Sequence, residues 1–247
     1  MITDIQIPFE TASIPAYYTI PDDSRQHPAI ILIHEIWGLN DHIKDIANRL
    51  QAQGYAVLAP DLLSGVGISE KIGTKLFQEM QNPATKDEAQ KELRNFFAPI
   101  NSPEFAEATM KKLKTCFSYL HAQENSNSKI GVIGFCFGGT YAFALAAAQP
   151  DIKAAVPFYG HAPEPLSTIQ AIACPVLAFY GGQDTELMKQ LPGLKDAMIL
   201  YHKQFLAVEY PDCGHAFFND TNPNRYNKEA AEDAWERVLE FLKINLE

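Results

Sequence analysis

Short apolar runs recur along most of the chain and are separated by stretches with helical spacing. The runs occupy residues 29–33, 56–59, 130–133, 154–158, 176–180 and 206–210. Apolar runs with so little polar interruption are typical of strands buried on both faces of a sheet. Helical stretches lie between them, at residues 42–53, 140–148, 194–203 and 228–244. This alternation predicts an α/β fold in which helices cover both faces of a mainly parallel sheet.

Two intervals depart from the simple alternation. Residues 3–9 and 14–20 form two extended segments before the first buried run, which predicts short N-terminal antiparallel strands. The interval from residue 60 to 129 holds three helical pieces, at 69–80, 86–97 and 104–121. Thr85 with Glu88 predicts a capping box at the second piece, and Ser102 before Pro103 predicts an N-cap at the third.

The long interval is more than one crossover requires. We therefore expect a single domain over residues 1–247 with an inserted helical cap at about residues 62–103. Such a cap can roof an active site, or it can simply cover hydrophobic sheet surface. The sequence leaves both alternatives open.

Composition and charge narrow the possible partners. The 247 residues are 47% hydrophobic, enough for a large core. A net charge of −10 repels nucleic acid and anionic membranes over most of the surface, so we expect neither as a partner. The start of the chain lacks the features of a signal peptide, and no apolar run approaches the roughly 20 residues of a membrane span, so we predict a cytoplasmic protein.

The cysteines do not suggest a disulfide framework or a metal site. Four cysteines are widely spaced and contain no C-x-x-C pair. We expect free thiols and no metal. Cys136 is the exception that suggests chemistry.

Cys136 lies in the run Gly134-Phe135-Cys136-Phe137-Gly138-Gly139, where a strand ends and a helix begins. The sharp turn that presents a nucleophile at this point needs small residues two positions before and after it. The following helix N-terminus favours a thiolate, and the amide of Phe137 is placed to face a developing oxyanion. The alternative is a buried structural cysteine in a glycine-rich turn.

An acid and a histidine follow two later strands. Asp184 comes after the run 176–180, and His215 comes after the run 206–210. Taken singly, Asp184 could be a helix cap and His215 a polar surface residue. Their order along the chain, nucleophile then acid then histidine, with each residue at the carboxyl end of a different strand, predicts a catalytic triad.

The loop after the first buried run supplies the remaining polar candidates. Ile36 is best placed to offer a second oxyanion amide. Glu35, at the mouth of a buried strand, needs solvent, a cation or a polar partner such as a thiol, or it is an exposed loop acid. The spacing of His34 and His42 fits no familiar zinc pattern, and we expect a packed and a surface histidine, respectively.

These separated stretches together resemble the dienelactone hydrolase family of the α/β-hydrolase superfamily. The resemblance covers most of the chain from Pro28 onward and includes 34–40, 54–62, 134–139, 182–184 and 214–217. It implies an α/β-hydrolase fold, a triad of Cys136, Asp184 and His215, and oxyanion amides at Ile36 and Phe137. It further implies that Glu35 interacts with the resting thiol.

The sequence departs from the family where the substrate is bound. The family holds a substrate carboxylate through arginines, one of them four positions after the catalytic histidine, where this chain has Asn219. Arg94 and Arg225 could replace that arginine, or both are surface residues. Trp37 and Tyr159 are further candidate substrate-binding residues.

The predicted function is hydrolysis of a small-molecule ester or lactone through a thioester acyl-enzyme, as in carboxymethylenebutenolidases, with no cofactor. A carboxylesterase with another natural substrate is one alternative. Another is a non-catalytic ligand-binding protein, or a thiol sensor that pairs Cys136 with Cys213 on the same fold. The oligomeric state stays open.

Overall fold

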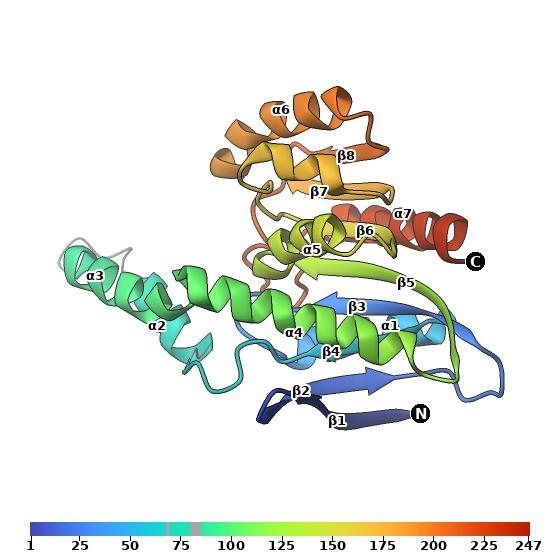
Figure 1. Cartoon of the computed structure of the whole chain (residues 1–247). Coiled ribbons are helices and arrows are strands. Elements are labelled where there is room, and N and C mark those ends of the chain that lie inside the picture. The colour runs from blue at the N-terminus through green and yellow to red at the C-terminus, as the bar shows by residue number, and fades with distance from the viewer. Residues whose placement is uncertain (68–69, 80–84) are drawn as a thin grey trace.

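A single eight-stranded sheet forms the centre of the computed structural model, which describes residues 1–67, 70–79 and 85–247 (Figure 1). The strand order is β1-β2-β4-β3-β5-β6-β7-β8. Strands β3 to β8 run parallel to one another, whereas β2 pairs antiparallel with both β1 and β4. The strands are β1 (Ile2–Phe9), β2 (Ala12–Thr19), β3 (His27–Ile33), β4 (Ala56–Pro60), β5 (Ser126–Phe135), β6 (Ile152–Phe158), β7 (Val176–Gly181) and β8 (Phe205–Tyr210).

Helices cover both faces of this sheet. Figure 1 shows α4 and α5 in front of the strands and α1 and α7 behind them. The central strands are therefore buried on both sides, which explains their uninterrupted apolar sequence. This confirms the predicted α/β architecture. The helices are α1 (Asp41–Ala52), α2 (Glu70–Glu79), α3 (Lys86–Phe97), η1 (Ala98–Asn101), α4 (Pro103–His121), α5 (Phe137–Ala148), η2 (Leu166–Ala171), α6 (Thr185–Leu200) and α7 (Lys228–Leu246).

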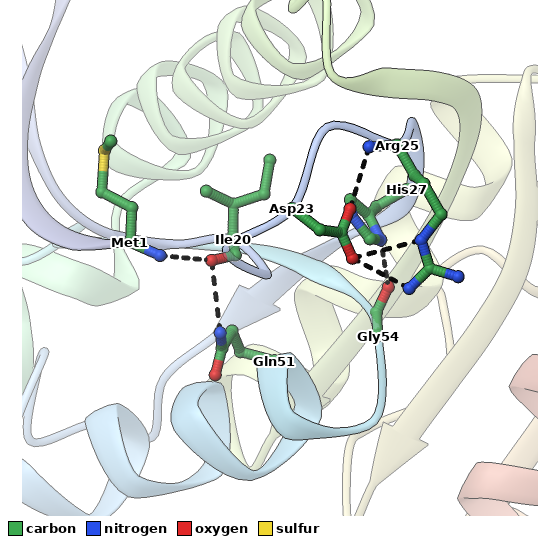
Figure 2. Close-up of polar contacts among 7 residues, drawn as sticks. All are labelled: Met1, Ile20, Asp23, Arg25, His27, Gln51 and Gly54. Carbon is green, nitrogen blue, oxygen red and sulfur yellow. Dashed lines mark hydrogen bonds and ion pairs between the residues drawn. The ribbon is translucent and has the colours of Figure 1, made fainter.

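The N-terminal strands are tied to the sheet by polar contacts around the β2–β3 turn (Figure 2). The amino group of Met1 donates to the carbonyl of Ile20 at 2.6 Å, and the same oxygen accepts from Gln51 Nε2 at 3.2 Å. The ring nitrogens of His27 lie 2.9 Å from Asp23 Oδ1 and 3.0 Å from the carbonyl of Gly54. These bonds join the start of β1 and β3 to the end of α1.

The three expected helices between β4 and β5 are present. Helices α2 and α3 lie on the side to which the arrows of the parallel strands point, whereas α4 runs along the sheet (Figure 1). Ser102 caps α4 by accepting from the amide of Phe105 at 3.1 Å, as predicted. Residues 69 and 80, the expected ends of the first helix, lie outside the described residues. The assignment of residues 62–103 as an active-site cap within one domain stays a prediction.

Three local expectations were wrong. Helix α6 begins at Thr185 rather than at residue 194 and contains Pro192. Leu187 and Leu191 of the added turns pack into the core, and their burial offsets the cost of a proline inside the helix. No capping box forms at α3, since the hydroxyl of Thr85 donates instead to the carbonyl of Glu79.

The third wrong expectation concerns His42, which was predicted to be a surface histidine. It is buried, with Nδ1 3.1 Å from Asp220 Oδ1.

Candidate active site

Three polar side chains come together at the edge of the sheet formed by the carboxyl ends of the parallel strands. Cys136 directly follows β5, Asp184 follows β7, and His215 lies in the loop after β8. Open α/β sheets place their sites at this edge. The structure therefore brings together the three residues that the sequence separates by 48 and 31 positions.

The backbone at Cys136 has an unusual conformation that exposes the sulfur. Its φ is 55° and its ψ is −113°, and α5 starts at the next residue. A Cβ at Gly134 would overlap the carbonyl oxygen of Gly138, and a Cβ at Gly138 would overlap the carbonyl oxygen of Ile33. Only glycine fits at either position. Close packing of this turn against β3 thus fixes where the thiol lies.

A short hydrogen bond joins the acid to the imidazole, which lies at the same cleft as the thiol. Nδ1 of His215 lies 2.6 Å from Asp184 Oδ2, and the imidazole lines the same cleft as Cys136. The second oxygen of Asp184 accepts from the amide of Leu187 at 3.4 Å. Asp184 is therefore both the N-cap of α6 and the partner of the histidine, so the two interpretations of this residue are compatible.

The protonation of His215 follows from these contacts. Burial acts to lower its pKa, but the hydrogen bonds and charges of Asp184 and Cys136 outweigh burial and raise the pKa to about 10. Burial acts to raise the pKa of Asp184, whereas the bond to His215 and its charge bring it below the ordinary value. At neutral pH the imidazole is thus a cation held between the carboxylate and the sulfur.

Glu35 is buried and both of its carboxylate oxygens are hydrogen-bonded. Oε1 accepts from the hydroxyl of Tyr159 at 3.3 Å, and Oε2 accepts from the amide of Asn219 at 2.7 Å. Burial, followed by the charges of Glu35 and Cys136, raises the pKa of Tyr159 well above its ordinary value, so the phenol stays a donor. Glu35 is therefore not an exposed loop acid.

His34 orients the loop that carries the candidate oxyanion amide. Its Nε2 accepts from the amide of Leu62 at 3.0 Å, so the ring proton lies on Nδ1, which donates to the carbonyl of Glu35 at 2.6 Å. Burial lowers the pKa of His34, in keeping with a neutral ring. Because carbonyl and amide point in opposite directions across a peptide, this bond sets the direction of the Ile36 N–H.

The candidate substrate-binding residues lie in different places. Tyr159 is buried, with its ring centroid 5.0 Å from that of His215. Trp37 packs against Gly73 of α2 and against Phe97 of α3, with ring centroids 6.0 Å apart in the latter pair. Arg94 on α3 and Arg225 after β8 are exposed and are not among the residues that line the cleft at Cys136.

That cleft has a volume of about 960 Å³ and reaches from the thiol along α5. Ile36, Cys136, Phe137, Tyr159 and His215 all line it, so both candidate oxyanion residues face the same space as the thiol. No cluster of three or more His, Cys, Asp or Glu side chains that could hold a metal occurs among the described residues. In the same part of the chain, no helix is long and apolar enough to cross a bilayer.

Sequence reasoning missed the roles of Asn219 and His34. Asn219 was identified only as the place where the family has an arginine, yet it donates to the buried Glu35 carboxylate. His34 was expected to be packed. Its hydrogen bonds to the amide of Leu62 and the carbonyl of Glu35 could not be predicted from the neighbouring sequence. The partner of each residue is set by the loops that meet at the sheet edge.

Comparison with known proteins agrees with this geometry. A model of the dienelactone hydrolase family matches residues 14–246. The chain belongs to the dienelactone hydrolase family. Membership makes it a hydrolase of carboxylic ester bonds, which disfavours the non-catalytic and thiol-sensing alternatives.

Individual relatives of this dienelactone hydrolase family member match it over most of both sequences. A protein of Saccharolobus solfataricus, provisionally named carboxymethylenebutenolidase, is 38% identical, covering 94% of this chain and 94% of its own. One of Methylorubrum extorquens with the same provisional name is 29% identical, covering 97% and 80%. A crystal structure from Klebsiella pneumoniae, provisionally named a dienelactone hydrolase, has a TM-score of 0.82 at 24% identity and covers 98% of both chains, which supports the α/β-hydrolase fold.

The glycine packing at the nucleophile turn gives a stability prediction. We expect Gly138→Ala to lower the free energy of unfolding by about 1–3 kcal/mol or more, because the added methyl group has no space beside β3. Gly193→Ala in α6 is the control, since its methyl group would make an ordinary contact of 3.6 Å with Leu166 and should stabilise by about 0.5–1 kcal/mol. Urea unfolding measures both; equal stabilities would contradict the packing argument.

The contacts of His215 give a pH prediction. Its folded-state pKa lies above the ordinary 6.5, so its protonation stabilises the folded chain fully below pH 6.5, and this stabilisation is lost as the pH rises through about 10. We expect Asp184→Asn to lower the pKa of His215 and to reduce this pH dependence. NMR titration of the imidazole and thermal unfolding against pH measure the two effects.

The matched control is Glu186→Gln, which removes a carboxylate two residues away that pairs with exposed Lys189. It should leave the titration of His215 unchanged. An Asp184→Asn variant whose imidazole titrates as in the wild type would show that the carboxylate does not set the protonation of His215.

Proposed function

We propose that this hydrolase cleaves a carboxylic ester or lactone through a thioester on Cys136, with His215 as acid and base and Asp184 as its orienting partner. The observation that carries the proposal is the 2.6 Å bond between the Asp184 carboxylate and the His215 imidazole, with that imidazole and the Cys136 thiol lining one 960 Å³ cleft. The related proteins provisionally named carboxymethylenebutenolidase favour a small lactone or ester as the substrate class.

The first half of the reaction forms the acyl-enzyme. The Cys136 thiolate attacks the substrate carbonyl, and the amides of Ile36 and Phe137 stabilise the oxyanion that develops. Collapse of this intermediate breaks the bond to the leaving oxygen, which takes the proton from the His215 imidazolium. The products of this half are an alcohol, or the opened end of a lactone, and a neutral imidazole beside a thioester.

The second half releases the acid. The neutral imidazole accepts a proton from water as the water oxygen attacks the thioester carbonyl, again with the oxyanion at the two amides. Collapse then breaks the carbon–sulfur bond and restores the thiolate and the imidazolium. Asp184 holds the ring through Nδ1 in both halves, so the same nitrogen stays directed to the reacting atoms.

Glu35 modulates the nucleophile as a fixed negative charge. Tyr159 donates to Glu35 and lines the same cleft as Cys136, so the carboxylate lies behind a side chain that borders the site of the thiol. A carboxylate near the sulfur disfavours the build-up of negative charge on it and so limits its oxidation between turnovers. Asn219 and Tyr159 keep Glu35 in this position.

Kinetics with p-nitrophenyl acetate test the assignment. We expect Cys136→Ala and His215→Ala to lower kcat/KM by at least roughly 10³-fold, since each removes a group that reacts in both halves. Cys213→Ala is the matched control, because this buried thiol lies two residues before His215 and has no role in the mechanism. Hydrolysis by Cys136→Ala at the wild-type rate would refute the nucleophile, and loss of activity in Cys213→Ala would favour a paired-thiol mechanism.

A further inference from the structure

The cleft continues beyond the catalytic residues as a groove along α5. Its lining includes Phe137, Tyr141, Ala144 and Ala148 of that helix, which begins directly after the nucleophile. With a rise of 1.5 Å per residue, the eleven steps from Phe137 to Ala148 span about 16 Å. Helix α5 packs against both α4 and the helical turn η2, and Met110 of α4 and Thr168 of η2 line the groove along with α5.

The surface of this groove is mostly apolar. Aromatic rings of Phe137 and Tyr141 lie next to the thiol, and the alanines follow one and two turns later on the same face of the helix. Met110 of α4 and Ala162 of the loop after β6 line the cleft as well. Small side chains at 144, 147 and 148 leave open the space that larger residues would fill.

Charge in the groove does not suit an anion. Within residues 1–67, 70–79 and 85–247, no lysine or arginine lines the cleft, and Glu164 is a carboxylate at its exposed edge. Apart from the catalytic His215 and the exposed His161, no basic side chain among these residues lines the cleft, so a substrate carboxylate bound along α5 would lose water without gaining a fixed cation, which is costly. The residue four positions after His215 does not supply a charge either, because it is the neutral Asn219. Its amide is hydrogen-bonded to Glu35.

We propose that the groove along α5 binds the uncharged, extended acyl chain of the substrate, so that the protein prefers neutral esters with medium-length chains to substrates that carry a carboxylate. This inference rests on the proposed function. The acyl group is the part of the substrate that stays bonded to the Cys136 sulfur after the alcohol leaves, and the groove begins at that sulfur.

The test is a series of p-nitrophenyl esters from acetate through butyrate and hexanoate to octanoate. We expect kcat/KM to rise at least about tenfold from acetate to octanoate, since each methylene that is buried contributes up to roughly fourfold. The p-nitrophenyl monoester of suberic acid, which has the same chain length with a terminal carboxylate, should react at least about tenfold more slowly than the octanoate.

Two variants test whether the acyl chain of the substrate lies in the groove. Ala144→Leu narrows the groove one turn beyond Thr140, and we expect it to lower the octanoate-to-acetate ratio of kcat/KM at least about fivefold. Ala148→Leu, at the exposed far end of α5, cannot disturb the core and should reduce the rate with octanoate but not the hexanoate-to-acetate ratio. The control Ala52→Leu changes an exposed alanine at the end of α1, outside the groove, and should alter neither ratio.

The outcomes separate this inference from the proposed function. Cys136-dependent hydrolysis with no chain-length preference, or a preference that both groove variants retain, overturns the acyl groove and leaves the triad standing. Equal rates for the octanoate and the suberate monoester overturn the preference for neutral substrates. Failure to hydrolyse any ester of the series, or hydrolysis that Cys136→Ala retains, overturns the proposed function and this inference with it.

Discussion

The strained turn at Cys136 is the constraint on which the rest of the site depends. Its positive φ of 55° persists because Gly134 and Gly138 allow the backbone to press against its own turn and against β3. That packing holds the sulfur at the edge of the sheet and starts α5 at the next residue. The candidate oxyanion amide of Phe137 and the groove along α5 both follow from this one local geometry.

Buried or half-buried ionisable groups lie at the sheet edge where this turn presents the sulfur. His215 is hydrogen-bonded to Asp184, and the carboxylate of Glu35 is hydrogen-bonded to Tyr159 and Asn219. Position 219 holds a neutral asparagine that is bonded to Glu35, so it offers no positive charge to a substrate. The cleft therefore presents the catalytic groups and mostly apolar walls. The proposed reactivity of the thiol and the proposed preference for an uncharged substrate thus rest on the same turn.

The sequence predicted the strands, the sheet edge and the meeting of Cys136, Asp184 and His215, because buried parallel strands and their loops leave strong local patterns. It did not predict interactions whose partners are distant. The burial of His42 depends on Asp220, 178 positions later, and the early start of α6 depends on core packing that outweighs Pro192. Both bonds of Glu35 come from distant loops, and the cytoplasmic location stays a prediction.

The most direct test of the central claim is mass spectrometry of the protein quenched during turnover of a p-nitrophenyl ester. The account predicts a mass increase equal to one acyl group, located on the peptide that contains Cys136 and removed by hydroxylamine as a thioester should be. An acyl group on any other residue, with Cys136 unmodified throughout turnover, would contradict the account.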